Sequence, residues 1–102
     1  MFSRLRCKGM PVALFAVTIR YTDDADRLNE TRPLHREYCK DLLDAGKIQQ
    51  SGPFVEGGGA LLIYEVADRS ELDEILANDP YTRNGVIAES TIHEWNVVFS
   101  RV

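Results

Sequence analysis

Two ionisable residues, His35 and Asp79, occupy positions that the surrounding pattern reserves for apolar side chains. With about 100° per residue around a helix, His35 projects within the same arc as Leu42, while the charged neighbours project to the opposite side. In a second amphipathic segment, Asp79 projects beside Leu76. An imidazole and a carboxylate held together can share proton-transfer work, because the acid orients the ring that moves the proton.

A structural interpretation stands beside this catalytic one. An inward histidine is often a hydrogen-bonded core residue, and an aspartate before proline often only terminates a helix. The partner of His35 is also open at this point, since Asp23 and Asp24 precede the helix that carries it. Each alternative predicts a different neighbour for the imidazole.

Further residues are candidates for a pocket around His35. Arg32 lies one helical turn earlier and would attract an anionic group of a substrate. Three other candidates would line the pocket, namely Ser51, Gly52 and Tyr81. The histidines and cysteines, His35, His93, Cys7 and Cys39, have no metal-ligand spacing, so we expect neither a metal nor another cofactor.

The first half of the chain predicts a strand, a loop and a helix. Residues 12–21 are rich in β-branched and aromatic side chains with apolar residues in both alternating sets, which predicts a strand buried on both faces. A loop over 22–29 and a helix over 30–45 follow. Pro33 is then tolerable in the first helical turn, and Gly46 is a C-terminal stop.

The second half predicts a hairpin, a helix and a strand. Pro53 interrupts a strand over 47–55, which implies an edge position or a bulge. A glycine turn at 57–59 leads to a strand over 60–66. The second helix is expected to begin at Ser70, with Asp73 in the reciprocal capping position, and to end at Pro80. The last strand is expected over 90–100, with Trp95 packed in the core or at a dimer interface.

The resulting order, β-α-β-β-α-β, is typical of an α+β ferredoxin-like domain, an antiparallel sheet with two helices on one face. Two strands are apolar on both faces, so the open face needs a cover. A second copy of the chain is the simplest one, which predicts a homodimer.

Composition limits the function classes. With 102 residues, 44% hydrophobic and 27% charged, the chain has room for one folded domain, which we place at 10–102 after a disordered extension over 1–9, with Met10 as the natural start. Three of the 12 basic residues lie in that extension, so the remainder is more acidic than the net charge of −4 suggests. Nucleic acid and membrane are therefore not expected partners, and two cysteines without a disulfide framework favour a reducing cytoplasm.

Three short motifs in this order resemble the YCII-related family: Arg32-Pro33-Leu34-His35, then Gly46-Lys47-Ile48 leading to Ser51-Gly52-Pro53, then Asp79-Pro80-Tyr81. The resemblance implies a dimeric α/β barrel akin to muconolactone isomerases, with a site built on His35 and Asp79. The relatives of this family include isomerases, dehalogenase-like enzymes and cofactor-free oxygenases. The loop between the second and third strands is shorter here than in many members.

Three hypotheses follow for the function. The first is a cofactor-independent enzyme that uses His35 and Asp79 for acid-base chemistry on a small anionic metabolite, in an isomerisation or elimination. The second is a non-catalytic module that binds a small molecule. The third is a dimerisation domain in which both residues are satisfied inside a dry core, and an open, polar-rimmed cavity beside His35 would count against it.

Overall fold

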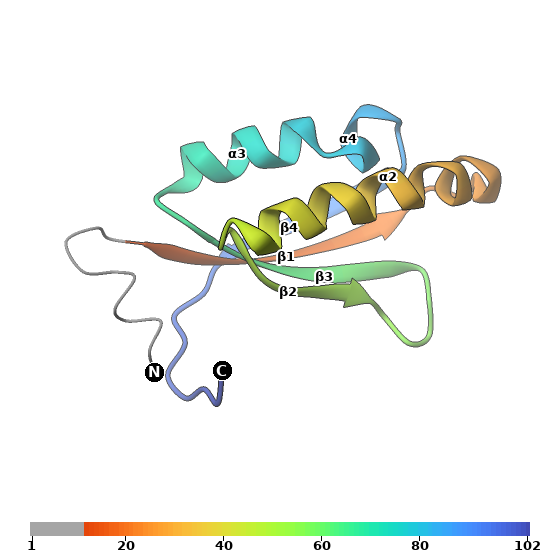
Figure 1. Cartoon of the computed structure of the whole chain (residues 1–102). Coiled ribbons are helices and arrows are strands. Elements are labelled where there is room, and N and C mark those ends of the chain that lie inside the picture. Colours follow the sequence, from red (N-terminus) through yellow and green to blue (C-terminus); the bar gives the residue numbers. More distant parts are fainter. Residues whose placement is uncertain (1–11) are drawn as a thin grey trace.

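The computed structural model describes residues 12–102 and shows a four-stranded antiparallel sheet with helices packed on one face (Figure 1). The order along the chain is β1 (Ala13–Tyr21), α2 (Ala25–Asp44), β2 (Ile48–Pro53), β3 (Gly59–Val66), α3 (Arg69–Asn78), α4 (Pro80–Arg83) and β4 (Ile87–Glu94). The sheet order is β2-β3-β1-β4, as in a ferredoxin-like fold. The predicted fold class is therefore confirmed, whereas the extension over 1–9 and the start at Met10 lie outside the described residues.

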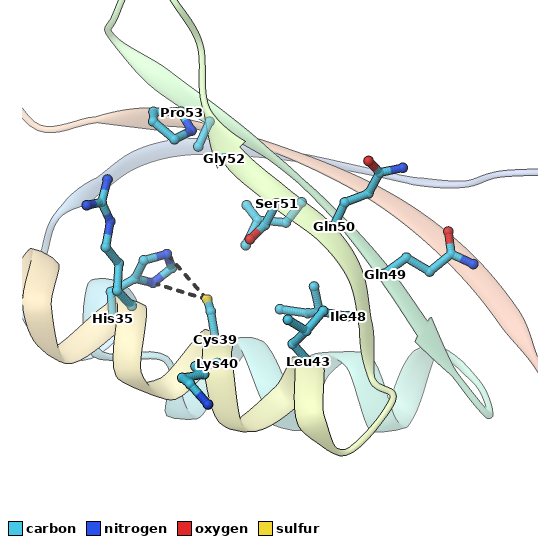
Figure 2. Close-up of a pocket in the computed structure, with 13 residues that line it drawn as sticks. His35, Cys39, Lys40, Leu43, Ile48, Gln49, Gln50, Ser51, Gly52 and Pro53 are labelled. Carbon is cyan, nitrogen blue, oxygen red and sulfur yellow. Dashed lines mark hydrogen bonds between the residues drawn. The ribbon is translucent and has the colours of Figure 1, made fainter. Parts of the chain in front are cut away.

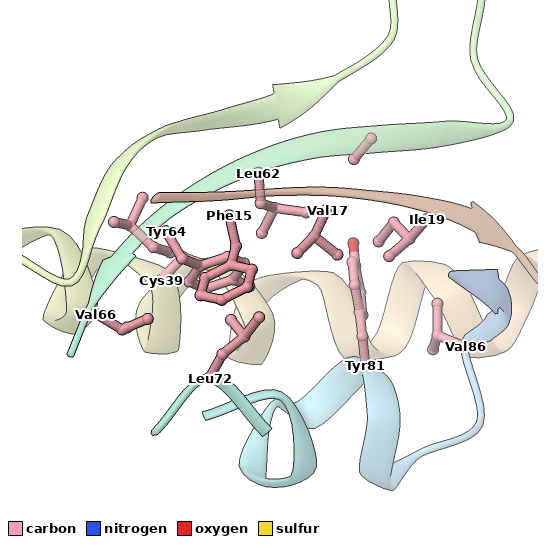
Figure 3. Packing of buried hydrophobic residues seen from close by; sticks show 12 residues of the cluster. Phe15, Val17, Ile19, Cys39, Leu62, Tyr64, Val66, Leu72, Tyr81 and Val86 are labelled. Atoms are coloured by element: carbon pink, nitrogen blue, oxygen red, sulfur yellow. The ribbon is translucent and has the colours of Figure 1, made fainter. Parts of the chain in front are cut away.

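The hydrophobic core lies between the sheet and the helices (Figure 3). Phe15, Val17 and Ile19 point to the helices from β1, because alternate side chains of a strand share a face. Leu62 and Tyr64 do the same from β3, and Leu72 of α3 packs over them. As predicted, β3 is buried on both faces at most positions, whereas in β1 only the set that faces the helices is buried, and Leu14, Ala16 and Thr18 on the other face are partly exposed.

Helix α2 begins earlier than predicted. Asp24 is its N-cap and accepts a hydrogen bond from the Arg27 backbone N–H at 3.0 Å, so the predicted loop over 22–29 is wrong beyond this residue. Pro33 consequently lies inside the helix rather than in its first turn. Its missing N–H would have bonded to the carbonyl of Asn29, an exposed residue that water can hydrate. Gly46 follows the helix with a φ of 79°, as its predicted role as a stop requires.

The cap of α3 also differs from the prediction. Asp68, not Ser70, is the N-cap, and its side chain accepts from the Glu71 backbone N–H at 2.9 Å. Glu71 in turn accepts from the backbone N–H of Ala67, the residue before the cap, at 2.7 Å, so a related arrangement lies two residues earlier than Ser70 and Asp73. The predicted cap was wrong because an aspartate offered the same chemistry slightly upstream.

The last strand is shorter than predicted. Strand β4 ends at Glu94, and the Trp95 backbone N–H makes one further bond to the Leu14 carbonyl at 2.8 Å. Beyond it the chain leaves the sheet on the side opposite to the helices (Figure 1). Trp95 is 45% exposed and Phe99 92% exposed, so neither is a core residue of the described chain. Among residues 12–102, no helix combines the length and apolarity needed to cross a membrane.

Candidate functional site

His35 and Asp79 lie in contact on the helix-covered side of the sheet, between α2 and the junction of α3 with α4. The imidazole Nδ1 lies 2.8 Å from the carboxylate Oδ1, and both residues are buried, at 8% and 3% exposure. The sequence left the partner of His35 open, and the structure brings Asp79 to it. Asp24 instead caps α2, and Asp23 is exposed.

The junction between α3 and α4 positions the carboxylate of Asp79. Asp79 is the C-cap of α3 and the N-cap of α4, with an extended backbone at φ −66° and ψ 130°. The following Pro80 favours this conformation, because its ring crowds a helical residue before it. The second helix was expected to end at Pro80, whereas α3 ends at Asn78 and Asp79 lies between two helices.

The same carboxylate oxygen accepts a second hydrogen bond. The Tyr81 backbone N–H donates to Asp79 Oδ1 at 2.9 Å. Since an ionised carboxylate only accepts hydrogen bonds, the bond to His35 requires the proton on Nδ1. In this tautomer the ring's basic lone pair lies on Nε2, so Nε2 is the nitrogen that can accept a proton from another molecule.

The Tyr81 ring holds the imidazole from one face. The two rings stack at a centroid distance of 3.7 Å with 6° between their planes, and Tyr81 is 2% exposed. Tyr21 makes an edge-to-face contact with Tyr81 at 5.8 Å, and the Arg32 guanidinium lies 5.9 Å from the Tyr21 centroid. Hydrogen bonding to the Tyr81 side chain raises the pKa of Arg32. Arg32 and Tyr81 are therefore neighbours of the pair that do not line the cavity described next.

A cavity of about 490 Å³ opens between α2 and the edge strand β2 (Figure 2). His35, Cys39 and Lys40 lie along its helical side, facing Ser51 and Gly52 across the cavity. The predicted Ser51 and Gly52 thus share a cavity with His35. Its volume falls in the usual range for small-molecule sites, about 300–1,000 Å³.

Cys39 is a neighbour of His35 that the sequence did not single out for the site. It follows His35 by one helical turn, and its Sγ lies 3.5 Å from Nε2 and 3.8 Å from Nδ1 (Figure 2). Burial, and then the nearby Asp79 carboxylate, raises the pKa of the thiol to about 12. The raised pKa favours the protonated form of the Cys39 thiol at neutral pH. The i,i+4 spacing from His35 was the available signal for this contact.

His35, Cys39 and Asp79 also place three potential metal-ligand atoms within 4.8 Å of one another. The sequence spacing did not predict this grouping. A metal ion would have to displace the proton between Nδ1 and Oδ1 and a second proton from a thiol with a raised pKa. As arranged, the three residues form a hydrogen-bonded network.

Comparisons with known proteins agree with this architecture. The YCII-related domain matches residues 13–96. A protein of Emericella nidulans described as "Derivative of benzaldehyde biosynthesis cluster protein C" is 26% identical over 77 residues, which cover 65% of this chain and 79% of that protein.

Solved structures show the same fold. The 5-chloro-2-hydroxyhydroquinone dehydrochlorinase TftG of Burkholderia phenoliruptrix AC1100, solved in complex with 2,5-dihydroxybenzoquinone, aligns with a TM-score of 0.72 and 24% identity, covering 81% of this chain and 93% of that one. An antibiotic biosynthesis monooxygenase aligns with a TM-score of 0.58 and 20% identity, covering 86% and 99%.

Proposed function

Because the chain belongs to the YCII-related domain family, we propose that it is a small-molecule-processing enzyme in which His35 transfers a proton and Asp79 orients His35. The observation that carries the proposal is the 2.8 Å contact between Nδ1 and Oδ1 beside a cavity of about 490 Å³. Burial of these two polar groups costs desolvation, which their mutual hydrogen bond offsets. The open cavity counts against the dimerisation-only hypothesis.

The proposed reaction is a proton abstraction next to a carbonyl. The Nε2 lone pair of His35 takes the proton from carbon and becomes an imidazolium, which the Asp79 carboxylate stabilises. The electron pair left on carbon moves to the carbonyl oxygen and forms an enolate. In an isomerisation, as in the muconolactone isomerases of the family resemblance, the imidazolium returns the proton to another carbon. In an elimination, the enolate expels a leaving group, and the imidazolium then loses its proton to water.

A solved relative supports the elimination branch. TftG is named a dehydrochlorinase, so its named reaction removes hydrogen and chloride from one molecule. Its structure holds a dihydroxylated quinone, a planar molecule of the size class that a cavity of about 490 Å³ accepts.

Assembly and location complete the proposal. We propose a homodimer in which a second copy covers the open face of the sheet, where Leu61 and Trp95 line a groove of about 380 Å³ with Ile63. Leu61 is 37% exposed although it lies on a central strand, which favours such a cover. We also propose that the domain spans residues 10–102 and that the protein is cytoplasmic.

Deuterium exchange tests the proposed chemistry. Small keto acids, unsaturated lactones and hydroxyhydroquinones, including 5-chloro-2-hydroxyhydroquinone, are incubated with the protein in D₂O, and mass spectrometry measures deuterium uptake and loss of chloride. We expect exchange with the wild type and a loss of about 10²-fold to 10⁴-fold in His35→Gln, the usual contribution of a general base.

His93→Gln is the matched control, since His93 is an exposed histidine on β4. The catalytic proposal requires that this variant exchange at the wild-type rate. Equal exchange by His35→Gln and the wild type would refute the role of His35. A ligand that binds to both proteins and is recovered without deuterium would instead support a non-catalytic binding module.

A further inference from the structure

A row of cations runs along the helix that borders the cavity. Arg32, Arg36 and Lys40 follow each other at intervals of four residues on α2, so they lie on one stripe of its surface. Like charges at this spacing disfavour a helix by about 0.2–0.5 kcal/mol per pair. Their presence on one stripe therefore has a cost that a bound anion would offset.

The three cations differ in what they contact. Arg32 lies 5.9 Å from the Tyr21 ring, and Lys40 forms an i,i+4 ion pair with Asp44 at 3.1 Å. Within residues 12–102, Arg36 forms no hydrogen bond or ion pair with another side chain, and it is exposed. Arg36 is thus the cation of the stripe whose guanidinium is available to a ligand.

The charge of the cavity wall has one sign. Arg36 and Lys40 line the cavity, and no aspartate or glutamate does so among the described residues. On the opposite wall, β2 contributes Ser51 and Gly52, while the side chains of Gln49 and Gln50 point away from the cavity (Figure 2). Because Lys40 is paired with Asp44, Arg36 is, within the described chain, the cation at this cavity whose charge is left for a ligand, and a cavity lined by an unpaired cation and no acid favours anions.

We propose that Arg36 binds a carboxylate or phenolate group of the substrate and so places the reacting carbon at Nε2 of His35. The planar guanidinium fork matches a carboxylate with two parallel hydrogen bonds, which fixes orientation as well as adding affinity. The sequence prediction gave this role to Arg32, but Arg32 does not line the cavity. The inference rests on the proposed function for the location of the site, and it makes Arg36 the residue that selects acidic substrates.

Benzoate and benzamide test the inference without requiring turnover, because they share a ring and differ in charge. Binding of each probe to the wild type is followed by isothermal calorimetry and by NMR shifts of the cavity residues. We expect benzoate to bind at least about tenfold more tightly than benzamide, a difference of about 1.4 kcal/mol. Arg36→Gln should reduce this preference to about twofold or less, and Arg36→Lys should retain part of it.

Matched variants separate the possible outcomes. Arg69→Gln removes an exposed arginine from α3, where it pairs with Asp73 at 2.8 Å, and should leave benzoate binding unchanged. Arg32→Gln tests the earlier assignment directly. Loss of the benzoate preference in Arg32→Gln with none in Arg36→Gln would overturn the inference in favour of Arg32.

Two further results would also overturn the role of Arg36. One is equal binding of both probes to the wild type, and the other is no binding of benzoate up to about 10 mM. Failure of the proposed function would appear in the deuterium-exchange assay and not in the binding of benzoate. His35→Gln should still prefer benzoate if Arg36 binds the anion, whether or not the wild type exchanges deuterium.

Discussion

Truncation of Asp79 tests the buried network at its centre. Asp79→Ala removes the oxygen that accepts the His35 Nδ1–H at 2.8 Å and the Tyr81 N–H at 2.9 Å. A hydrogen bond to a charged group is worth about 1.5–3 kcal/mol, and a buried donor left without an acceptor costs about 1–3 kcal/mol. Because the imidazole can move its proton to Nε2, the two losses do not add fully, and we expect about 3 kcal/mol less stability.

Asp79→Asn separates the charge from the shape of this side chain. Its amide oxygen can still accept from both donors, so we expect a loss of only about 1 kcal/mol, the value of a neutral hydrogen bond. Urea unfolding followed by far-ultraviolet circular dichroism gives the free energy of unfolding of both variants. Asp73→Ala is the control, since Asp73 forms an exposed i,i+4 pair with Arg69 that should contribute less than about 1 kcal/mol.

The ranking of the three variants decides the question. If Asp79→Ala unfolds with a free energy within about 1 kcal/mol of the wild type, the carboxylate is not the acceptor that satisfies the two buried N–H groups. If Asp79→Asn is as damaging as Asp79→Ala, the negative charge rather than the acceptor position stabilises the fold. A stable Asp79→Asn that loses deuterium exchange would support an orienting and charge-stabilising role in the reaction.

Two other predictions concern the sheet and the N-terminal end of α3. A Cβ on Gly59 would lie 2.0 Å from the Ile19 carbonyl oxygen, so Gly59→Ala must push β3 away from β1. We expect this variant to lose more than about 3 kcal/mol of unfolding free energy, measured by urea unfolding. Gly52→Ala is the control, because nothing lies within 4 Å of its Cβ, and it should lose less than about 1 kcal/mol. Equal stability of these two variants would contradict the close strand contact. The hydrogen bond from the Ala67 N–H, and then Lys47, lower the pKa of Glu71, so its stabilisation is present above the unfolded pKa and is lost as pH falls through the lower folded pKa. Glu71→Gln should therefore be less stable than the wild type by about 1 kcal/mol at pH 7, and this difference should shrink as the pH falls through the folded pKa of Glu71. A difference that is constant with pH would refute the ionic origin.

The fold was predictable because its main signals are periodic. Continuous apolar runs in β1 and β3 place these strands at the centre of the sheet, and Pro53 places β2 at an edge. The predicted helix starts were wrong where a nearby aspartate could cap the helix at another position. Asp24 and Asp68 each cap a helix at a position that the predicted boundaries did not use. Pro33 misplaced the start of α2, because a proline is expected in a first turn.

The site was predictable only in part, since its geometry depends on packing between helices. The helical projection placed His35 and Asp79 inward but left their separation open, and the structure gives a 2.8 Å contact. The stacking of Tyr81 on His35 has no sequence signal, because it depends on the path of α4, a helix of four residues. The charged residues of α2 were expected on the side opposite to His35, and only the position of β2 shows that Arg36, one of these residues, borders a cavity.

The structural and catalytic interpretations of Asp79 are compatible, because one geometric constraint serves both. Pro80 holds Asp79 in an extended conformation, which ends α3 and begins α4. That same turn brings the Tyr81 N–H to the carboxylate and places the Tyr81 ring at 3.7 Å from the imidazole. A helix terminator and a core histidine are thus the elements from which the acid-base pair is built. Since Asp79, Pro80 and Tyr81 act together, a substitution of Pro80 should disturb the orientation of His35 without touching it.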